Sequence, residues 1–192
     1  MPEQDDVPLR AHLDEVLIGG REKRPIVVVD YDPAWPARFT MERGRINRAL
    51  DQLPHSVEHI GSTAVPGLAA KPIIDILLTV DDVQDEAAYR PALERAGYVL
   101  RVREDGHRMF RTPQIDVHLH VYAAASPEVR RYLLLRDWLR ASPADRVAYA
   151  QVKRRLAGQD WEDMNFYAQA KDSIVASVLG HAEQWAAQGG KH

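Results

Sequence analysis

The 192-residue sequence contains no cysteine. This absence excludes disulfides, thiolate nucleophiles, iron–sulfur clusters and cysteine-based zinc sites. A basic excess is also missing: 25 Lys and Arg against 28 Asp and Glu give a net charge of −3 and a pI near 6.2, which disfavours a dedicated nucleic-acid binder. No run approaches about 18 consecutive apolar residues, so a membrane span is not expected. The N-terminus lacks the basic start and apolar run of a signal peptide, and we expect a cytoplasmic protein.

The composition is that of a globular chain, with 45% hydrophobic and 28% charged residues. A chain of this length suggests one domain. We expect residues 1–25 to be an N-terminal extension, with a short amphipathic helix over residues 9–18. Residues 26–188 then form a single domain that is mixed α/β to about residue 124 and helical beyond it.

The elements of this domain follow from periodicity and turn residues. Strands are predicted over residues 26–29, 55–60, 72–80, 98–103, 107–111 and 115–122. Helices are predicted over residues 33–53 and 85–96, then from residue 126, from residue 142, and over 161–185. The predicted fold is α/β (α+β), a mixed sheet of about four to six strands with packed helices and a C-terminal helical region.

Residues 59–76, HIGSTAVPGLAAKPIIDI, are the most informative stretch. Gly61 would let the backbone approach a ligand closely, and backbone N–H groups with the Ser62 and Thr63 hydroxyls could hold a phosphate. Asp75 stands in an otherwise apolar strand, where a carboxylate needs a metal, a cation or hydrogen-bond donors as its partner. The plainer alternative is that the loop is only a turn, and that Asp75 lies at an exposed strand end or pairs with the nearby lysine.

This stretch resembles the GrpB family of small bacterial proteins, a member of the polymerase-beta-like nucleotidyltransferase superfamily. The resemblance extends over roughly residues 26–180 and includes residues 28–36, 117–121, 136–139, 149–153 and 167–171. It implies the superfamily fold, in which a Gly-Ser pair and an Asp-x-Asp strand hold two Mg²⁺ ions and a triphosphate. The chain departs from this pattern at Leu77, where the second carboxylate would stand. With that carboxylate missing, one of the two ions would be poorly held.

The predicted strand over residues 115–122 offers a replacement ligand set. Its alternation places Asp116, His118 and His120 on one face. The resemblance implies that this strand lies beside the Asp75 strand, so His118 or His120 could face that carboxylate, and His59 could join them. Two imidazoles and a carboxylate suit Mn²⁺, Fe²⁺, Zn²⁺ or Ni²⁺ better than Mg²⁺. Alternatively, these histidines act as a general base, bind a substrate in a polar cleft or lie solvated at the sheet edge.

Several cations and aromatic residues could hold a nucleotide. The candidates are Lys71, Arg108, Arg111, Tyr149, Lys153, Tyr167 and Lys171. Each Tyr–Lys pair has a spacing of four, so both members share one helix face and could stack a base and neutralise phosphate. The alternative is a buried tyrosine with a lysine stem packed across it. For the arginines, the alternative is a solvated sheet surface.

The resemblance implies a protein that binds an NTP and a divalent metal, Mg²⁺ or Mn²⁺ with Zn²⁺ as a further candidate. It would transfer a nucleotidyl group to a small substrate, or activate that substrate. Two alternatives stay open. One is a non-catalytic nucleotide-binding or accessory module linked to coenzyme A metabolism, since some relatives are fused to dephospho-CoA kinase. The other is a metal-dependent enzyme of different chemistry that uses the His/Asp site. Neither a membrane nor a nucleic-acid partner is expected.

Overall fold

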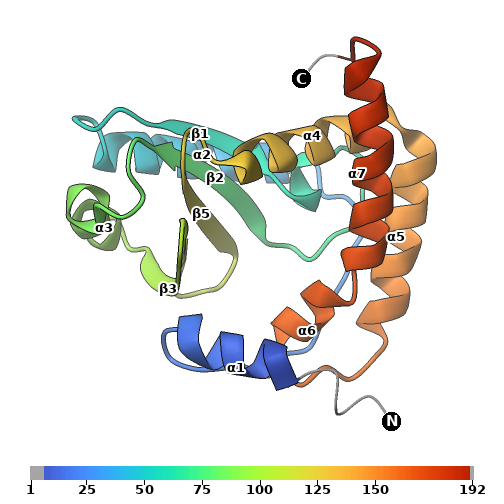
Figure 1. The fold of residues 1–192 in the computed structure, drawn as a ribbon, viewed down its shortest axis with the longest axis horizontal. Helices are drawn as coiled ribbons and strands as arrows, with labels where there is room; N and C mark the ends of the chain where they lie inside the picture. Colours follow the sequence, from blue (N-terminus) through green and yellow to red (C-terminus); the bar gives the residue numbers. More distant parts are fainter. Residues whose placement is uncertain (1–6, 191–192) are drawn as a thin grey trace.

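The computed structural model describes residues 7–190, so residues 1–6 of the expected extension and residues 191–192 lie outside it. Its centre is a five-stranded sheet of order β1-β2-β5-β4-β3 (Figure 1). The strands are β1 (Ser56–Ile60), β2 (Ile74–Val80), β3 (Val99–Glu104), β4 (His107–Arg111) and β5 (Val117–Ala123). β2 and β5 pair in parallel and the other neighbours are antiparallel, which confirms the predicted mixed sheet.

Helices lie along the sheet, and the C-terminal helices form a group at one end of it (Figure 1). They are α1 (Val7–Val16), α2 (Trp35–Ala49), the short 3₁₀ turn η1 (Ser62–Ala64), α3 (Glu86–Arg95), α4 (Pro127–Ala141), α5 (Pro143–Ala157), α6 (Met164–Gln169) and α7 (Asp172–Ala187). α4 and α5 begin as predicted, because the Ser126 and Ser142 side chains cap them and a proline follows each cap.

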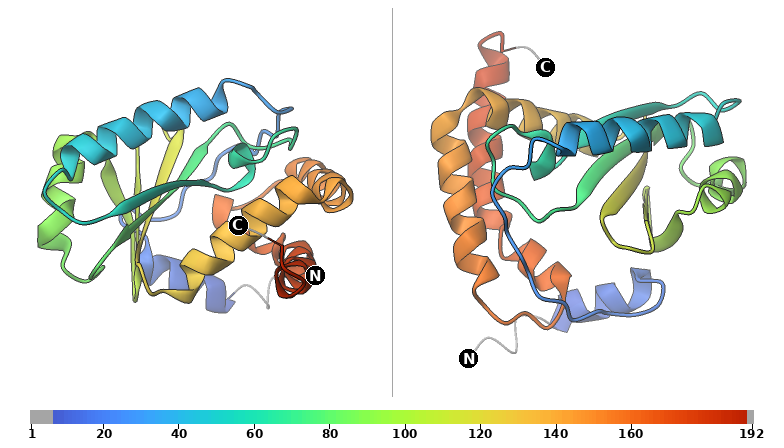
Figure 2. Two further views of the ribbon diagram at one scale, coloured as in Figure 1. Left: turned by 90° about the horizontal axis from the view of Figure 1, so that it is seen from above. Right: turned by 180° about the vertical axis from the view of Figure 1, so that it is seen from behind.

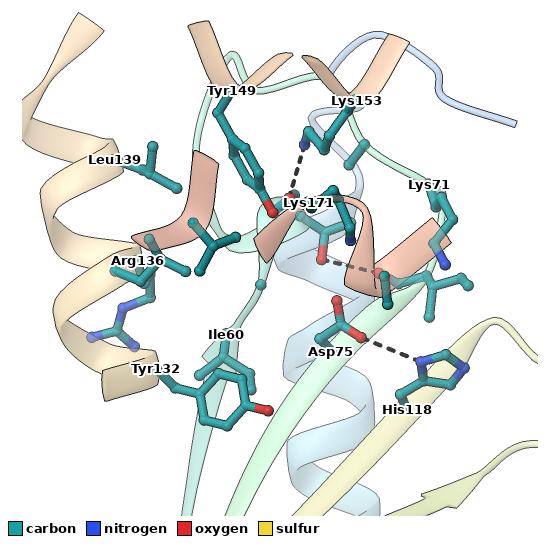
Figure 3. A pocket seen from close by; sticks show the side chains of 18 of the residues that line it. Ile60, Lys71, Asp75, His118, Tyr132, Arg136, Leu139, Tyr149, Lys153 and Lys171 are labelled. Atoms are coloured by element: carbon teal, nitrogen blue, oxygen red, sulfur yellow. Dashed lines mark hydrogen bonds and ion pairs between the residues drawn. The ribbon is translucent and has the colours of Figure 1, made fainter. Parts of the chain in front are cut away.

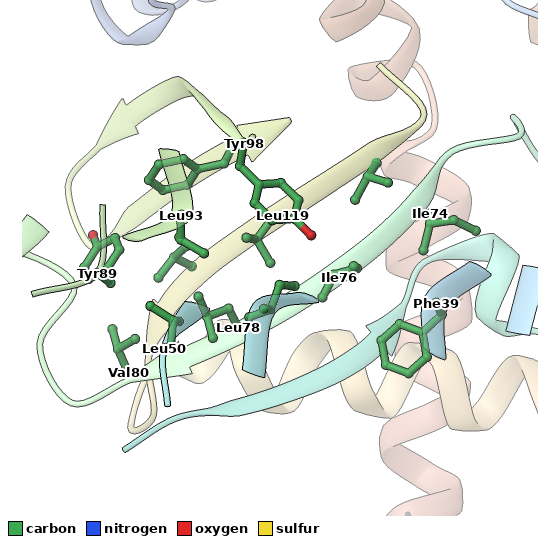
Figure 4. Packing of buried hydrophobic residues seen from close by; sticks show 14 of the residues in the cluster. Phe39, Leu50, Ile74, Ile76, Leu78, Val80, Tyr89, Leu93, Tyr98 and Leu119 are labelled. Carbon is green, nitrogen blue, oxygen red and sulfur yellow. The ribbon is translucent and has the colours of Figure 1, made fainter. Parts of the chain in front are cut away.

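The two faces of the sheet carry different side chains. Alternate residues of β2 and β5, Ile74, Ile76 and Leu119 among them, pack against α2 and α3 in the main core (Figure 4). Burying each such side chain stabilises the fold by about 1.5–3 kcal/mol. On the opposite face, Leu77 and Tyr122 pack beneath α4. Figure 2 shows α2 and α4 on opposite sides of the sheet. The residues between those of the main core therefore point toward α4.

The segment that follows β1 joins the sheet to the helical group. Val65 and Leu68 are fully buried and pack with Leu139 of α4, Tyr149 of α5 and Val178 of α7. This packing fixes the loop after Gly61 between the end of β1 and helices α4, α5 and α7. The same contacts set the distance between the sheet and these helices.

Three predicted elements differ from the structure. Residues 26–29 do not form a strand, because only Val29 pairs with another segment, bridging Ala70 through two 2.9 Å hydrogen bonds. The helix predicted over residues 161–185 is two helices, α6 and α7, separated at Ala170 and Lys171. β5 begins at Val117 and not at Ile115, whose φ of 58° takes it out of the extended conformation.

The described part of the N-terminal extension lies along the edge of the sheet. It contains the predicted short helix, as α1. The Ile18 N–H donates to the carbonyl of Arg101 in β3 at 2.9 Å, and the Arg101 guanidinium donates to the carbonyls of Ile18 and Gly20. Farther along, Arg111 of β4 donates to Glu22 at 2.6 Å. The extension therefore covers edge strand β3, whose backbone groups would otherwise be unpaired.

Candidate functional site

A cavity of about 380 Å³ lies between the α4 face of the sheet and the helical group. Figure 3 shows side chains from β2, β5, helices α4 and α5 and the turn before α7 around it. The loop residues Gly61, Ser62 and Thr63 close one side, so the cavity brings together parts of the chain far apart in sequence.

Asp75, His118 and His120 meet at the sheet side of this cavity. Asp75 pairs with His118 across the parallel β2–β5 ladder, and Leu77 pairs with His120. One possible ligand atom from each of Asp75, His118 and His120 lies within 4.8 Å of the others, and Nδ1 of His118 lies 3.5 Å from Oδ1 of Asp75. A carboxylate with two imidazoles is a donor set that suits Mn²⁺, Fe²⁺ or Zn²⁺. These three residues therefore fit one divalent metal, and within residues 7–190 no further group of metal ligands lies beside them.

The charge of Asp75 is favoured by its neighbours. Burial acts to raise the pKa of this carboxyl, but the hydrogen bond from His118 and the charges of His118, His120 and Lys71 outweigh burial and lower the pKa below its usual value. His120 behaves in the opposite way, because burial lowers its pKa to about 3. Near neutral pH the site thus presents a carboxylate and a neutral His120 imidazole, the protonation states that a metal requires.

Gly61 makes room for the Asp75 carboxylate. Its φ of 68° and ψ of −170° belong to a conformation that is essentially restricted to glycine. A Cβ at this position would collide with Oδ2 of Asp75 and lie 2.9 Å from its Cβ. The hydroxyls that follow are already bonded. Ser62 accepts from Nζ of Lys153 at 2.9 Å, and Thr63 donates to the carbonyl of Ile73 at 3.2 Å.

Three lysines also line the cavity. The whole chain has only five lysines, and three of them, Lys71, Lys153 and Lys171, line this one cavity. Their ammonium groups rest on two tyrosine rings: Lys153 lies 4.6 Å from the centroid of Tyr149, and Lys171 and Lys71 lie 4.7 and 5.3 Å from that of Tyr167. Such cation–π contacts hold cations that are removed from water.

Burial disfavours the charge of all three ammonium groups, and repulsion between the lysines adds to this at Lys153 and Lys171. Burial lowers the pKa of Lys153 to about 7, with a further contribution from repulsion by Lys171. Burial and the charge of Lys71 lower the pKa of Lys171 to about 8. Burial also lowers the pKa of Lys71, partly offset by Asp75. A bound polyanion would stabilise these charges through strong, charge-assisted hydrogen bonds.

The family model for GrpB proteins matches residues 25–181. The chain belongs to the GrpB family. A UPF0157 protein of Halalkalibacterium halodurans is 48% identical over 177 residues, covering 88% of this chain and 90% of that one. A UPF0157 protein of Streptomyces coelicolor is 50% identical over 166 residues, covering 86% and 89%. The crystal structure of GrpB from Enterococcus faecalis has a TM-score of 0.73 at 33% identity and covers 83% of this chain and 99% of that one.

More distant matches place the GrpB fold among polymerase-beta-like nucleotidyltransferases. The structure of a GLD-2/RNP-8 complex matches with a TM-score of 0.51 at 17% identity, over 66% of this chain and 55% of that one. A dephospho-CoA kinase of Mycolicibacterium paratuberculosis is 28% identical over 193 residues, and this chain covers 47% of its length. Within residues 7–190, no helix is long and apolar enough to span a bilayer.

Three candidates lie outside the cavity of this GrpB protein. His59 points to the α2 face, where it stacks on Phe39 at 4.6 Å between centroids, and burial lowers its pKa to about 4. Arg108 is buried and donates to Glu86 at 2.6 Å. Arg111 is held by Glu22 of the extension. His59 is therefore not placed to complete the metal site, and the two arginines are not placed to meet a phosphate there.

The tyrosines also differ from the expected arrangement. Tyr149 and Tyr167 line the cavity as expected, but they are 7% and 1% exposed, and lysine ammonium groups occupy ring faces that were expected to stack a base. The sequence prediction missed the wall formed by α4, and this wall consists of Glu128, Arg131, Tyr132, Leu135, Arg136 and Leu139. Their spacing of three and four residues marks one helix face, which is the signal that could have identified them.

Proposed function

We propose that this GrpB protein binds a nucleoside triphosphate and one divalent metal in the cavity and transfers a nucleotidyl group to a small acceptor. The observation that carries the proposal is that two kinds of groups line one cavity. Asp75, His118 and His120 form a metal-ligand set, and Lys71, Lys153 and Lys171 gather around the rings of Tyr149 and Tyr167. A metal-bound triphosphate would satisfy both sets at once.

Each group has a role that its position supports. Asp75, His118 and His120 would hold the metal, which when bound supplies Lewis-acid stabilisation of phosphoryl oxygens. Lys153 reaches the Ser62 hydroxyl, so it would hold a phosphate at the Gly61–Ser62 turn. Lys71 and Lys171 share the ring of Tyr167 and would neutralise the remaining phosphate charge.

The metal preferred by this site would not be Mg²⁺. Two of its three ligands are imidazoles, whereas Mg²⁺ prefers oxygen. With Leu77 in place of a second carboxylate, the described residues offer ligands for one ion beside Asp75. We therefore propose one resident metal of the Mn²⁺ or Zn²⁺ class, with any second ion depending on the nucleotide for most of its ligands.

An accessory role is the second candidate. The similarity to dephospho-CoA kinases favours it, because this chain matches about half the length of those proteins. In that role the same cavity would bind a nucleotide without turning it over. We propose that the protein then acts in coenzyme A metabolism, where nucleotides with several phosphates are the common ligands.

A thermal-shift series separates these proposals. The full chain would be heated with ATP, CTP, GTP or UTP, each alone and with Mn²⁺, Zn²⁺ or Mg²⁺. A ligand at about 100 times its Kd adds about 2.7 kcal/mol, which is about 5–10 °C in Tm for a chain of this size. We expect a shift with one nucleotide plus Mn²⁺ or Zn²⁺, and its loss in Asp75→Asn.

The matched control is Asp51→Asn, which makes the same chemical change at an exposed position. It should keep the full shift. Pyrophosphate release with a pool of small acceptors would establish transfer, whereas a metal-dependent shift without release would favour the accessory role. If no nucleotide shifts Tm under any metal condition, nucleotide binding at this cavity is wrong.

A further inference from the structure

A line of polar contacts runs from His120 to the surface through residues that no prediction included. Nδ1 of His120 lies 3.2 Å from Nε2 of His107 in β4. Nδ1 of His107 lies 3.2 Å from Oε2 of Glu104 in β3, and Oε1 of the same carboxylate lies 3.1 Å from Nε2 of His12 in α1. The line therefore crosses three neighbouring strands and ends at α1.

The His107 ring is also held in place by packing. It stacks on Tyr122 with 4.5 Å between centroids and an interplanar angle of 10°. It is nearly parallel to His120 as well, with an interplanar angle of 9°. These contacts hold the plane of the ring, and the contact of Nδ1 with Glu104 sets which edge of the ring faces His120, because a flipped ring would lose it.

The donor and acceptor roles along the line follow from its acidic end. A carboxylate only accepts, so Glu104 requires the proton of His107 on Nδ1. In a neutral ring Nε2 of His107 is then an acceptor, and His120 must donate from its own Nδ1. This leaves the lone pair of His120 on Nε2, the nitrogen that His107 does not engage. A neutral imidazole with a free ring nitrogen is the form that binds a metal.

We propose that Glu104 and His107 are positioning residues that fix the tautomer and ring orientation of His120 as a metal ligand. The inference rests on the proposed metal site and gives a reason why that site would prefer one class of metal ion. Metal-bound histidines are commonly oriented in this way by a carboxylate or another acceptor, and losing the partner costs about 10–100-fold in metal affinity. The arrangement selects a metal that takes imidazole nitrogen over Mg²⁺.

The test uses Co²⁺, whose visible absorption reports the number and type of its ligands. The full chain would be titrated with Co²⁺ beside His107→Phe, which keeps an aromatic ring on Tyr122 but has no ring nitrogen. We expect a Kd about 10–100-fold weaker and an altered absorption band in the variant. His107→Gln places an amide oxygen where Nε2 lies, and should recover most of the affinity. His55→Phe, a histidine outside the cavity that bonds to Leu53 and Asn47, should match the wild type.

The outcomes separate this inference from the proposed function. If Asp75→Asn abolishes Co²⁺ binding while both His107 variants bind within twofold of the wild type, the metal site stands and the positioning role is overturned. If the wild type binds no Co²⁺, both proposals fail together. If His107→Phe unfolds, Glu104→Leu decides, because it removes the acceptor of the Nδ1 proton of His107 at a side chain that is 38% exposed. A Kd at least tenfold weaker with an altered band supports the role, and wild-type affinity with an unchanged band overturns it.

Discussion

Replacing Lys153 with methionine should make the protein more stable and weaken its binding of polyanions. Lys153 is 3% exposed, and burial lowers its pKa from a usual value near 10.5 to about 7. At pH 7 the unfolded chain keeps this proton fully and the folded protein holds it half the time. At about 1.36 kcal/mol for each pKa unit, the lysine lowers the free energy of unfolding by roughly 4 kcal/mol.

Methionine removes that penalty but also removes a donor. Lys153 donates to the hydroxyl of Ser62, which is partly exposed and open to water, and to the carbonyl of the buried Ala69. Only the second acceptor is left buried without its donor, at a cost of about 1–3 kcal/mol. The side chains have similar volume, so packing changes little. We expect a net stabilisation of about 1–3 kcal/mol at pH 7.

The dependence on pH isolates the electrostatic part. Between about pH 7 and 10.5 the unfolded chain binds a proton that folded Lys153 has released, so this lysine makes wild-type stability rise with pH. The advantage of Lys153→Met should therefore shrink by about 2 kcal/mol between pH 7 and pH 9. The lost hydrogen bonds add the same offset at both values.

Urea denaturation at pH 7 and pH 9 measures both quantities, and calorimetric titration with ATP and Mn²⁺ measures binding. We expect the Kd for ATP to rise at least about tenfold, because a loss of only 1.4 kcal/mol in binding free energy already weakens binding tenfold. Lys23→Met removes the charge of an exposed lysine paired with Asp160, and should change stability by no more than about 0.5 kcal/mol. A Lys153→Met protein that is less stable at pH 7, with a gap that does not change by pH 9, would refute the reasoning.

Two further substitutions test the surroundings of the site. Gly61→Ala should cost about 1–3 kcal/mol in backbone strain and also abolish Co²⁺ binding, because its Cβ collides with Asp75. The control is Gly106→Ala, which has a similar φ of 69° but nothing near its Cβ. We expect Co²⁺ binding to be retained in Gly106→Ala and lost only in Gly61→Ala. Glu86→Gln should destabilise the fold by roughly 2–3 kcal/mol in urea at pH 7 and leave ATP affinity unchanged. Its pKa of about 2, lowered chiefly by the hydrogen bond from Arg103, means that its contribution is lost as pH falls from about 4.5 to 2. Weakened ATP binding in a stable Glu86→Gln protein would show that Arg108 serves the cavity.

The local pattern of the sequence predicted β5 and its histidines well. Alternation alone put His118 and His120 on one face, but it could not say which side of the sheet that face meets. The answer comes from the neighbours of the histidines, since Leu119 packs in the main core against α2 and so turns the histidines toward α4. Strand position in the sheet is a long-range property that one strand's sequence does not contain.

Other features depend still more on distant contacts. The β-branched run over residues 26–29 has strand propensity, yet only Val29 finds a partner, and propensity without pairing does not make a strand. The break between α6 and α7 has no glycine or proline to mark it, and Phe166 and Tyr167 are buried just before it. That break places Lys171 beside Lys71, a meeting that no spacing along the chain could predict.

Leu77 explains why this site differs from the two-carboxylate pattern that the family resemblance implied. Its side chain is fully buried with Ile60 and Tyr122, beneath Tyr132 and its neighbours on α4. A carboxylate there would be removed from water and would carry a cost of several kcal/mol unless a metal paired with it. The helix that covers Leu77 also lies beside His120, the residue paired with Leu77 across the β2–β5 ladder. An apolar residue on β2 and an imidazole on β5 are thus two parts of one arrangement, in which α4 closes the sheet over position 77 and leaves the ligands of the cavity to Asp75 and the β5 histidines.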